Sequence, residues 1–223
     1  MKARQQFTQL AQSLLSHDVG MAIVDVRGTG DAEGELIDVT WNDWCDDVAA
    51  AYASLAKTGV PVFVLGLRLG GLLGLISLKN ATFSAAGLVL WEPQFSGKVA
   101  LKPFLRMGAM SAKLAGREQV NAPGDTREIG GYLLSNAFEQ SLNEAVASTD
   151  FPAQAGLIVK VSAEENTDLP PAWNAALAPW KEAGVSLTID HVKFPTFWNT
   201  TEIIASDTLT DITQAWIVAR LAQ

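Results

Sequence analysis

The chain contains few of the side chains that form disulfides and metal sites. Its 223 residues include one cysteine, Cys45, and two histidines, His17 and His191. A single thiol excludes an internal disulfide framework, and this set of side chains cannot complete a Cys/His zinc site. We therefore expect neither a metal nor a cofactor. Nothing in the cysteine content points to an oxidising compartment, and we expect a cytoplasmic protein.

Runs of basic residues are also absent. The 16 Lys and Arg residues against 24 Asp and Glu give a formal net charge of −8, which argues against a nucleic-acid or anionic membrane surface. The most apolar stretch, residues 59–78, is long enough to cross a bilayer, but its proline, its glycines and its central Arg68 would be costly in lipid. The amino-terminal segment lacks the continuous apolar core of a secretory signal. We expect no nucleic-acid partner and no membrane span.

Strand and helix patterns alternate along most of the chain. Short apolar runs predict strands at 21–26, 61–65, 85–93, 156–161 and 185–194. Helical spacing predicts a first helix that begins near residue 2, and further helices at 41–55, 69–78, 171–184 and 209–221. Such alternation indicates a mostly parallel sheet with helices on both faces. The stretch from about 97 to 152 predicts a helical insertion, with helices at 104–114 and 131–148. At this length we treat residues 1–223 as a single domain.

A glycine-framed turn follows the strand at 61–65. Residues 66–71 read GLRLGG, and Gly66 and Gly70 have the spacing of the G-x-S-x-G turn, which lifts its middle side chain to the start of a helix. The middle residue here is Arg68. A guanidinium stays protonated at any working pH, so it cannot attack a carbonyl as serine or cysteine would. Conventional acyl-enzyme chemistry is therefore not expected at this turn.

The sequence contains the motifs DVRGTGDAEGE, GLRLGG, LWEPQFSGKVALKPFLRM, GGYLLSNAF and FPTFWNTTEI. They resemble motifs of one group within the α/β-hydrolase superfamily, the exosortase A system-associated hydrolase 2 family. The resemblance covers nearly the whole chain, and that family also carries arginine at the turn. It implies an α/β-hydrolase fold, the label of hydrolase, and an association with exosortase sorting and exopolysaccharide clusters in bacteria. A small anionic or saccharide-related ligand is then expected.

The resemblance also implies positions for a catalytic triad, which this sequence fills poorly. The loop after the last strand, where the base is expected, contains no histidine. His191 lies earlier, on the strand, as a candidate base or as a strand histidine bonded to a neighbour. Glu164 and Glu165 follow the strand at 156–161 as candidate acids, with a solvated loop as the alternative. Other nucleophile candidates are poor: Cys45 is expected mid-helix and facing the core, and Ser96 and Ser162 lack a neighbouring base.

Arg68 itself has two interpretations that the sequence leaves open. An arginine at a helix start adds a fixed charge to free backbone N–H groups, that of Leu69 among them, and so makes a site for a carboxylate or phosphate. Alternatively, it forms an internal ion pair with Glu92 or Glu164. The functional hypotheses follow: an enzyme that uses Arg68 with Glu164 or Glu165 and His191, or a non-catalytic protein that holds an anionic ligand or partner.

Two further features bear on the site. Of the seven tryptophans, Trp91 and Trp198 are expected near its mouth as ligand contacts, and the others in the core.

The resemblance implies strands and an oxyanion-forming loop ahead of the first helix, which this chain lacks, and the last of those strands would lie between 21–26 and 61–65. We consider three explanations: a start codon assigned too late, direct pairing of the two flanking strands, or a second chain that supplies the strand, as in a homodimer.

Overall fold

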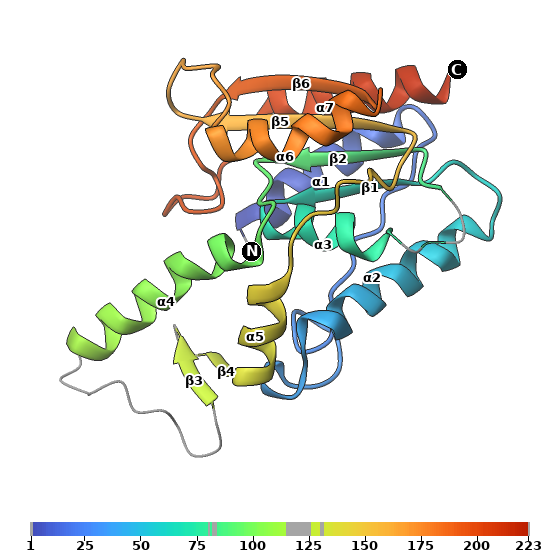
Figure 1. Cartoon of the computed structure of the whole chain (residues 1–223). Coiled ribbons are helices and arrows are strands. Elements are labelled where there is room, and N and C mark those ends of the chain that lie inside the picture. Colours follow the sequence, from blue (N-terminus) through green and yellow to red (C-terminus); the bar gives the residue numbers. More distant parts are fainter. Residues whose placement is uncertain (1, 80, 82–83, 115–125, 130–131, 223) are drawn as a thin grey trace.

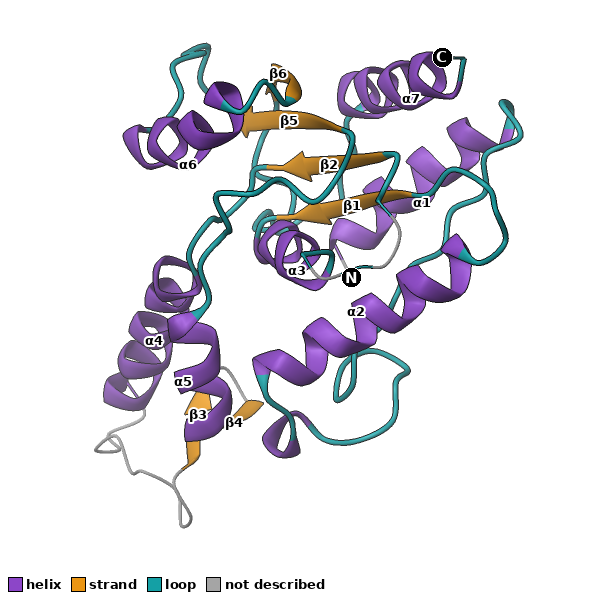
Figure 2. Ribbon diagram, turned by 45° about the vertical axis from the view of Figure 1, so that its right-hand side comes forward, coloured by secondary structure: helices purple, strands orange, loops and turns teal. Residues whose placement is uncertain are grey.

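The computed structural model describes residues 2–79, 81, 84–114, 126–129 and 132–222. Its centre is a four-stranded sheet in the order β1 (Phe63–Leu67), β2 (Gly87–Trp91), β5 (Ala155–Ser162) and β6 (Ser186–Lys193). Every pairing in this sheet is parallel. Helices α1 (Lys2–Leu15) and α7 (Asp207–Leu221) cover one face, and α3 (Leu69–Ser77) and α6 (Pro171–Glu182) the other (Figures 1 and 2). The predicted parallel sheet with helices on both faces is confirmed.

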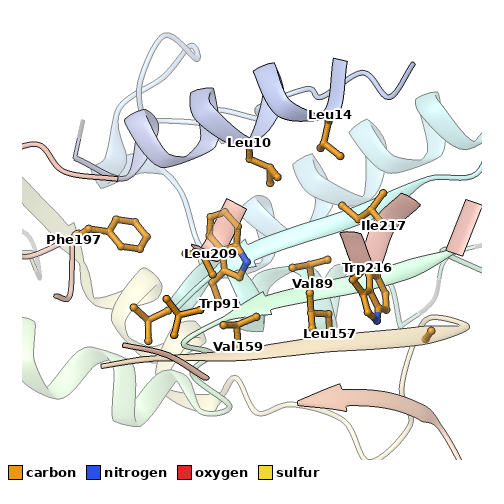
Figure 3. Packing of buried hydrophobic residues seen from close by; sticks show 13 residues of the cluster. Leu10, Leu14, Val89, Trp91, Leu157, Val159, Phe197, Leu209, Trp216 and Ile217 are labelled. Atoms are coloured by element: carbon orange, nitrogen blue, oxygen red, sulfur yellow. The ribbon is translucent and has the colours of Figure 1, made fainter. Parts of the chain in front are cut away.

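The two faces of the sheet belong to separate apolar clusters because successive strand residues point to opposite sides. In β2, Val89 and Trp91 pack towards α1 and α7, while Leu88 and Leu90 pack towards α3 and α6. Figure 3 shows the first cluster, in which Leu10 of α1 lies over the sheet. All five β2 residues are buried, as expected for a strand in the middle of a parallel sheet.

The remaining elements form a lobe beside α3. It contains the 3₁₀ turn η1 (Leu36–Asp38), helices α2 (Trp41–Ala56), α4 (Gly97–Leu114) and α5 (Asn136–Glu144), and an antiparallel hairpin of β3 (Thr126–Ile129) and β4 (Tyr132–Ser135). A third apolar cluster joins these helices to α3. The insertion is therefore not helical throughout. The helix predicted at 131–148 begins only at Asn136, because the Ser135 side chain caps it by accepting the Phe138 N–H.

The predicted strand at 21–26 does not form. These residues carry no strand assignment, and Ile23 and Val24 are exposed. A pocket of about 210 Å³, lined by apolar residues of α1, β1 and the segment 19–22, lies in this region. Direct pairing of this segment with β1 is thus also wrong, since the sheet of the described residues begins at β1. A strand needs a partner for its backbone hydrogen bonds, and none of those residues supplies one here. Among the helices of the described residues, none has the length and apolar character needed to cross a membrane.

Candidate functional site

The carboxyl ends of the four parallel strands place charged and titratable side chains in one row across the sheet. The last pairing of β1 with β2 is Leu67 with Trp91, and the row continues through β5 and β6. One residue further along the four strands stand Arg68, Glu92, Lys160 and His191. Three of these are residues that the sequence singled out, and the parallel register brings them to the same edge.

Arg68 lies at the apex of a strained turn. Its φ of 52° and ψ of −114° fall in a region that residues with side chains seldom adopt. The Arg68 N–H donates to the Trp91 carbonyl at 2.9 Å, and its carbonyl accepts from the Gly71 N–H at 3.0 Å. A Cβ at Gly66 would lie 2.4 Å from the Gly70 carbonyl oxygen, so only glycine fits there. The chain therefore builds the bend of a G-x-S-x-G turn with arginine in the middle.

The Arg68 guanidinium is partly buried without an anionic partner. Its Cζ lies 5.3 Å from the centroid of the Trp198 ring, a cation–π contact. Within the part of the chain that the structure describes, no carboxylate forms an ion pair with it and no acceptor takes its N–H groups. Burial lowers the pKa of Arg68, and the charge of Glu92 raises it by a smaller amount. The predicted ion pairs with Glu92 and Glu164 are not formed.

Glu92 occupies the equivalent position after β2 and also has a positive φ, 44°. Its Oε2 accepts the Val161 N–H at 2.9 Å, which holds the carboxyl group against β5. Burial raises the pKa of Glu92, and this effect outweighs the Val161 N–H and the charges of Arg68, Lys160 and His191, which all lower it. A carboxyl group in such surroundings exchanges its proton closer to neutral pH than a solvated one does.

Sequence reasoning missed a hydrogen bond between Ser162 and His191. Ser162 Oγ lies 2.9 Å from His191 Nε2, although the residues are 29 apart in the chain. Ser162 Oγ also donates to the Glu164 carbonyl oxygen at 3.0 Å. The expectation that Ser162 has no base near it is therefore wrong. The signal that could have found the pair is strand register, because Lys160 lies opposite His191 and residues two apart share a face.

The other predicted acids face solvent. Glu164 and Glu165 lie on the exposed loop after β5. The Glu165 carboxylate pairs with Lys193 Nζ at 2.5 Å, also at the surface. Glu164 contributes its backbone carbonyl, not its carboxylate, to Ser162. Glu92 is thus the carboxyl group that acts electrostatically on Arg68.

The two candidate tryptophans have different positions. Trp91 is 0% exposed, stacks on Phe7 with ring centroids 5.5 Å apart, and donates its Nε1–H to Thr213 Oγ1 at 3.0 Å. It belongs to the core beneath α1, as Figure 3 shows, so the expectation that it contacts a ligand is wrong. Trp198 does lie at the site, with its ring over Arg68. Its Nε1 is buried and finds no acceptor among the described residues.

Other reactive side chains lie apart from this edge. Cys45 packs in the cluster that joins α2 to α3, and burial raises the pKa of its thiol to about 11, so the thiol stays protonated at neutral pH. Leu69, partly buried, is the first residue of α3 and adds its backbone N–H to the turn. Across the described ranges, no group of three or more His, Cys, Asp or Glu side chains could hold a metal ion.

The parallel sheet, its helices on both faces and the glycine-framed turn define an α/β-hydrolase fold. Solved structures share it. Tomato methylketone synthase I, solved in complex with 2-tridecanone, is 12% identical, with a TM-score of 0.62 over 96% of this chain and 92% of that one. A monoacylglycerol lipase from Paleococcus ferrophilus is 15% identical, with a TM-score of 0.60 over 97% and 90%. A thermophilic esterase from Thermogutta terrifontis, solved with malate bound, is 15% identical, with a TM-score of 0.55 over 95% and 85%.

Sequence comparison defines the family more closely. The model of the serine aminopeptidase S33 family matches residues 3–145. The match spans more than half of the chain, and the protein therefore belongs to the serine aminopeptidase S33 family of α/β-hydrolases. No curated protein matches the sequence. The position of the serine in the G-x-S-x-G turn is taken in this chain by Arg68.

Proposed function

We propose that this α/β-hydrolase-fold protein binds a small carboxylate or phosphate anion at Arg68, and that the Arg68 turn forms no acyl-enzyme. One observation carries the proposal: the guanidinium is partly buried at a helix N-terminus, and no described carboxylate pairs with it. Removing a charge from water without pairing it costs several kcal/mol. A bound anion would offset that cost.

The surroundings of Arg68 offer further contacts to an anion. The N–H groups of Leu69 and Gly70, the first two residues of the nine-residue helix α3, have no intrahelical acceptor and lie at the positive end of the helix dipole. Space above Gly70 is open, because a Cβ built there meets nothing within 4 Å. Trp198 covers one face of the guanidinium, which leaves the N–H groups at its edge free for a bidentate contact with two oxygens of the anion.

Glu92 makes this binding dependent on pH. When ionised, it adds a negative charge near the anion and opposes binding. When protonated, it does not, and burial favours the protonated form by raising the pKa of Glu92. We therefore expect the affinity for an anion to increase as pH falls through the pKa of Glu92 and to level off below it. The effect of Arg68 itself does not change over this range, because its guanidinium stays charged.

We further propose that the chain is a member of the exosortase A system-associated group and that its ligand comes from exopolysaccharide metabolism in the cytoplasm. The motifs around the turn and after the last strand support this assignment, and Trp198 and Arg68 belong to those motifs. A sugar acid or a sugar phosphate carries the oxyanion that Arg68 would hold. Such ligands also carry hydroxyl groups for the neighbouring polar side chains.

Calorimetric titration tests the proposal directly. Wild type is titrated with glutarate, glucuronate and inorganic phosphate at constant ionic strength, and at least one should give saturable binding. Arg68→Met, which keeps an unbranched side chain but no charge, should abolish it. Arg106→Met is the matched control, since Arg106 is exposed on α4 and the same charge is lost. Equal binding by wild type and Arg68→Met, or no binding of any of the three anions, would overturn the proposal.

A further inference from the structure

We propose that Ser162 and His191 form a reactive pair that accepts an acyl group from an activated ester, which is a function beyond anion binding at Arg68. The pair rests on geometry that neither Arg68 nor its turn supplies: Ser162 Oγ and His191 Nε2 are 2.9 Å apart. A nucleophilic hydroxyl within hydrogen-bond distance of an imidazole nitrogen is the arrangement needed for activation by a general base.

The fold holds this pair at the carboxyl edge of the sheet. Ser162 is the last residue of β5, and His191 lies on the adjacent strand β6, opposite Lys160. Both residues are partly buried and keep some exposure to solvent. An incoming ester can therefore reach Ser162 Oγ, while the strand backbones limit the movement of both side chains.

Glu92 lies beside the pair. Its carboxyl group accepts the N–H of Val161, the residue before Ser162, at 2.9 Å. The charge of His191 lowers the pKa of Glu92, so the two groups interact electrostatically. An ionised Glu92 would attract an imidazolium formed on His191 during the reaction. Glu92 follows the end of β2, whereas Glu164 and Glu165 lie on the exposed loop after β5.

The Ser162 hydroxyl group can donate its hydrogen bond to either of two acceptors. In one arrangement it bonds to the Glu164 carbonyl at 3.0 Å, and His191 donates its Nε2–H to Ser162. In the other, Ser162 donates to an unprotonated His191 Nε2, which is the reactive form. Glu164 lies on an exposed loop, so water can replace the serine at its carbonyl. The reactive arrangement therefore needs only rotation of one hydroxyl group and the matching imidazole tautomer.

The reaction step balances without a cofactor. Ser162 Oγ attacks the ester carbonyl carbon and forms a C–O bond, while its proton passes to His191 Nε2. The tetrahedral intermediate breaks the bond to the leaving oxygen, which takes the proton from His191 and departs as an alcohol or phenol. The product is an ester on Ser162. Water then attacks that ester with His191 again taking a proton, and the carboxylic acid and free Ser162 result.

Acetylation by p-nitrophenyl acetate tests this pair. Wild type should release nitrophenolate with an initial burst, and mass spectrometry should place one acetyl group on Ser162. Ser162→Ala should remove that modification. His191→Gln, which can still donate to Ser162 but cannot accept its proton, should slow acetylation by about a hundredfold or more. Ser96→Ala is the control and should react as wild type does, because Ser96 lies on a different segment with no described base.

Two additional measurements keep the outcome unambiguous. Circular dichroism establishes that each variant is folded, and Ser162→Cys restores a nucleophile if the alanine variant is unstable; its thiol should be acetylated in its place. Calorimetric titration reads anion binding and mass spectrometry reads the acetyl group on Ser162, so failure of this inference and failure of the anion-binding proposal are seen separately. Acetylation of wild type no faster than that of Ser162→Ala, or an acetyl group mapped only to lysines, would overturn the inference.

Discussion

Replacing Arg68 by glycine should give a more stable protein than replacing it by alanine, against the usual order of these two residues. Arg68 is held at a φ of 52° and a ψ of −114°. Glycine adopts such a conformation readily, whereas alanine is strained there as arginine is. Both substitutions remove the guanidinium and its contact with Trp198. The comparison of the two variants therefore isolates the strain of the backbone.

The magnitude follows from two opposing contributions. Backbone strain in a sparsely populated region costs about 1–3 kcal/mol, and glycine relieves it. Glycine loses more conformational freedom on folding, which costs about 0.5–1 kcal/mol relative to alanine. The glycine variant should thus have the higher free energy of unfolding by about 0.5–2 kcal/mol. For a chain of this size each kcal/mol shifts the melting temperature by about 2–4 °C.

Urea denaturation followed by circular dichroism measures the difference, with equal m values required for both variants. Gln140 provides the control, because it lies exposed in α5 with ordinary helical geometry. There the alanine variant should be the more stable one by about 1 kcal/mol. If glycine at position 68 is no more stable than alanine, the turn is not strained as the backbone angles indicate, and the reasoning fails.

Further substitutions test the surroundings of the turn and the core beneath it. Gly66→Ala should destabilise the fold by about 3 kcal/mol or more, since its Cβ would overlap the Gly70 carbonyl, whereas Gly70→Ala, in open space, should raise the melting temperature slightly. Glu92→Gln should be more stable than wild type at neutral pH, because burial raises the pKa of Glu92 and makes its charge costly in the folded state. The gain should shrink as pH falls and protonates the wild-type carboxyl in both states, and a gain that grew towards acid pH would contradict the direction of the pKa shift. Trp91→Phe and Thr213→Val should show a coupling free energy of about 1 kcal/mol in a double-mutant cycle, from their buried hydrogen bond. Neither should alter anion binding, and a Trp91 variant with lost affinity would place that ring at the site.

Features that depend on local pattern could be predicted from the sequence. The apolar runs that became β1, β2, β5 and β6 mark buried parallel strands, and Gly66 and Gly70 mark the turn around Arg68. These predictions are confirmed because residues a few positions away in the sequence determine each strand and the turn. The hairpin of β3 and β4 was missed because the apolar residues at 132–134 suit a strand or a helix equally well, and only pairing with β3 decides between them.

Features that depend on distant contacts could not be predicted in the same way. The segment 21–26 has the composition of a strand but lacks a neighbour to bond with, so composition alone gave the wrong answer. The hydrogen bond between Ser162 and His191 requires the register of β5 against β6. The burial of Trp91 follows from the side of β2 on which it falls, and a residue at the end of a strand could have turned to either face.

The outer edge of β1 influences which part of the sheet opens first. Alternate β1 amides point towards β2 and bond to it, while the others point outward, where no described strand lies. The outward amides should exchange their hydrogen for deuterium rapidly, and those of the central strand β2 should exchange slowly, close to the rate set by global unfolding. The other edge strand, β6, pairs with β5 over eight residues, whereas β1 pairs with β2 over five, so opening of the sheet should begin at β1. Because β1 leads directly into the Arg68 turn, this opening would disturb residue 68 before β5 or β6 separates.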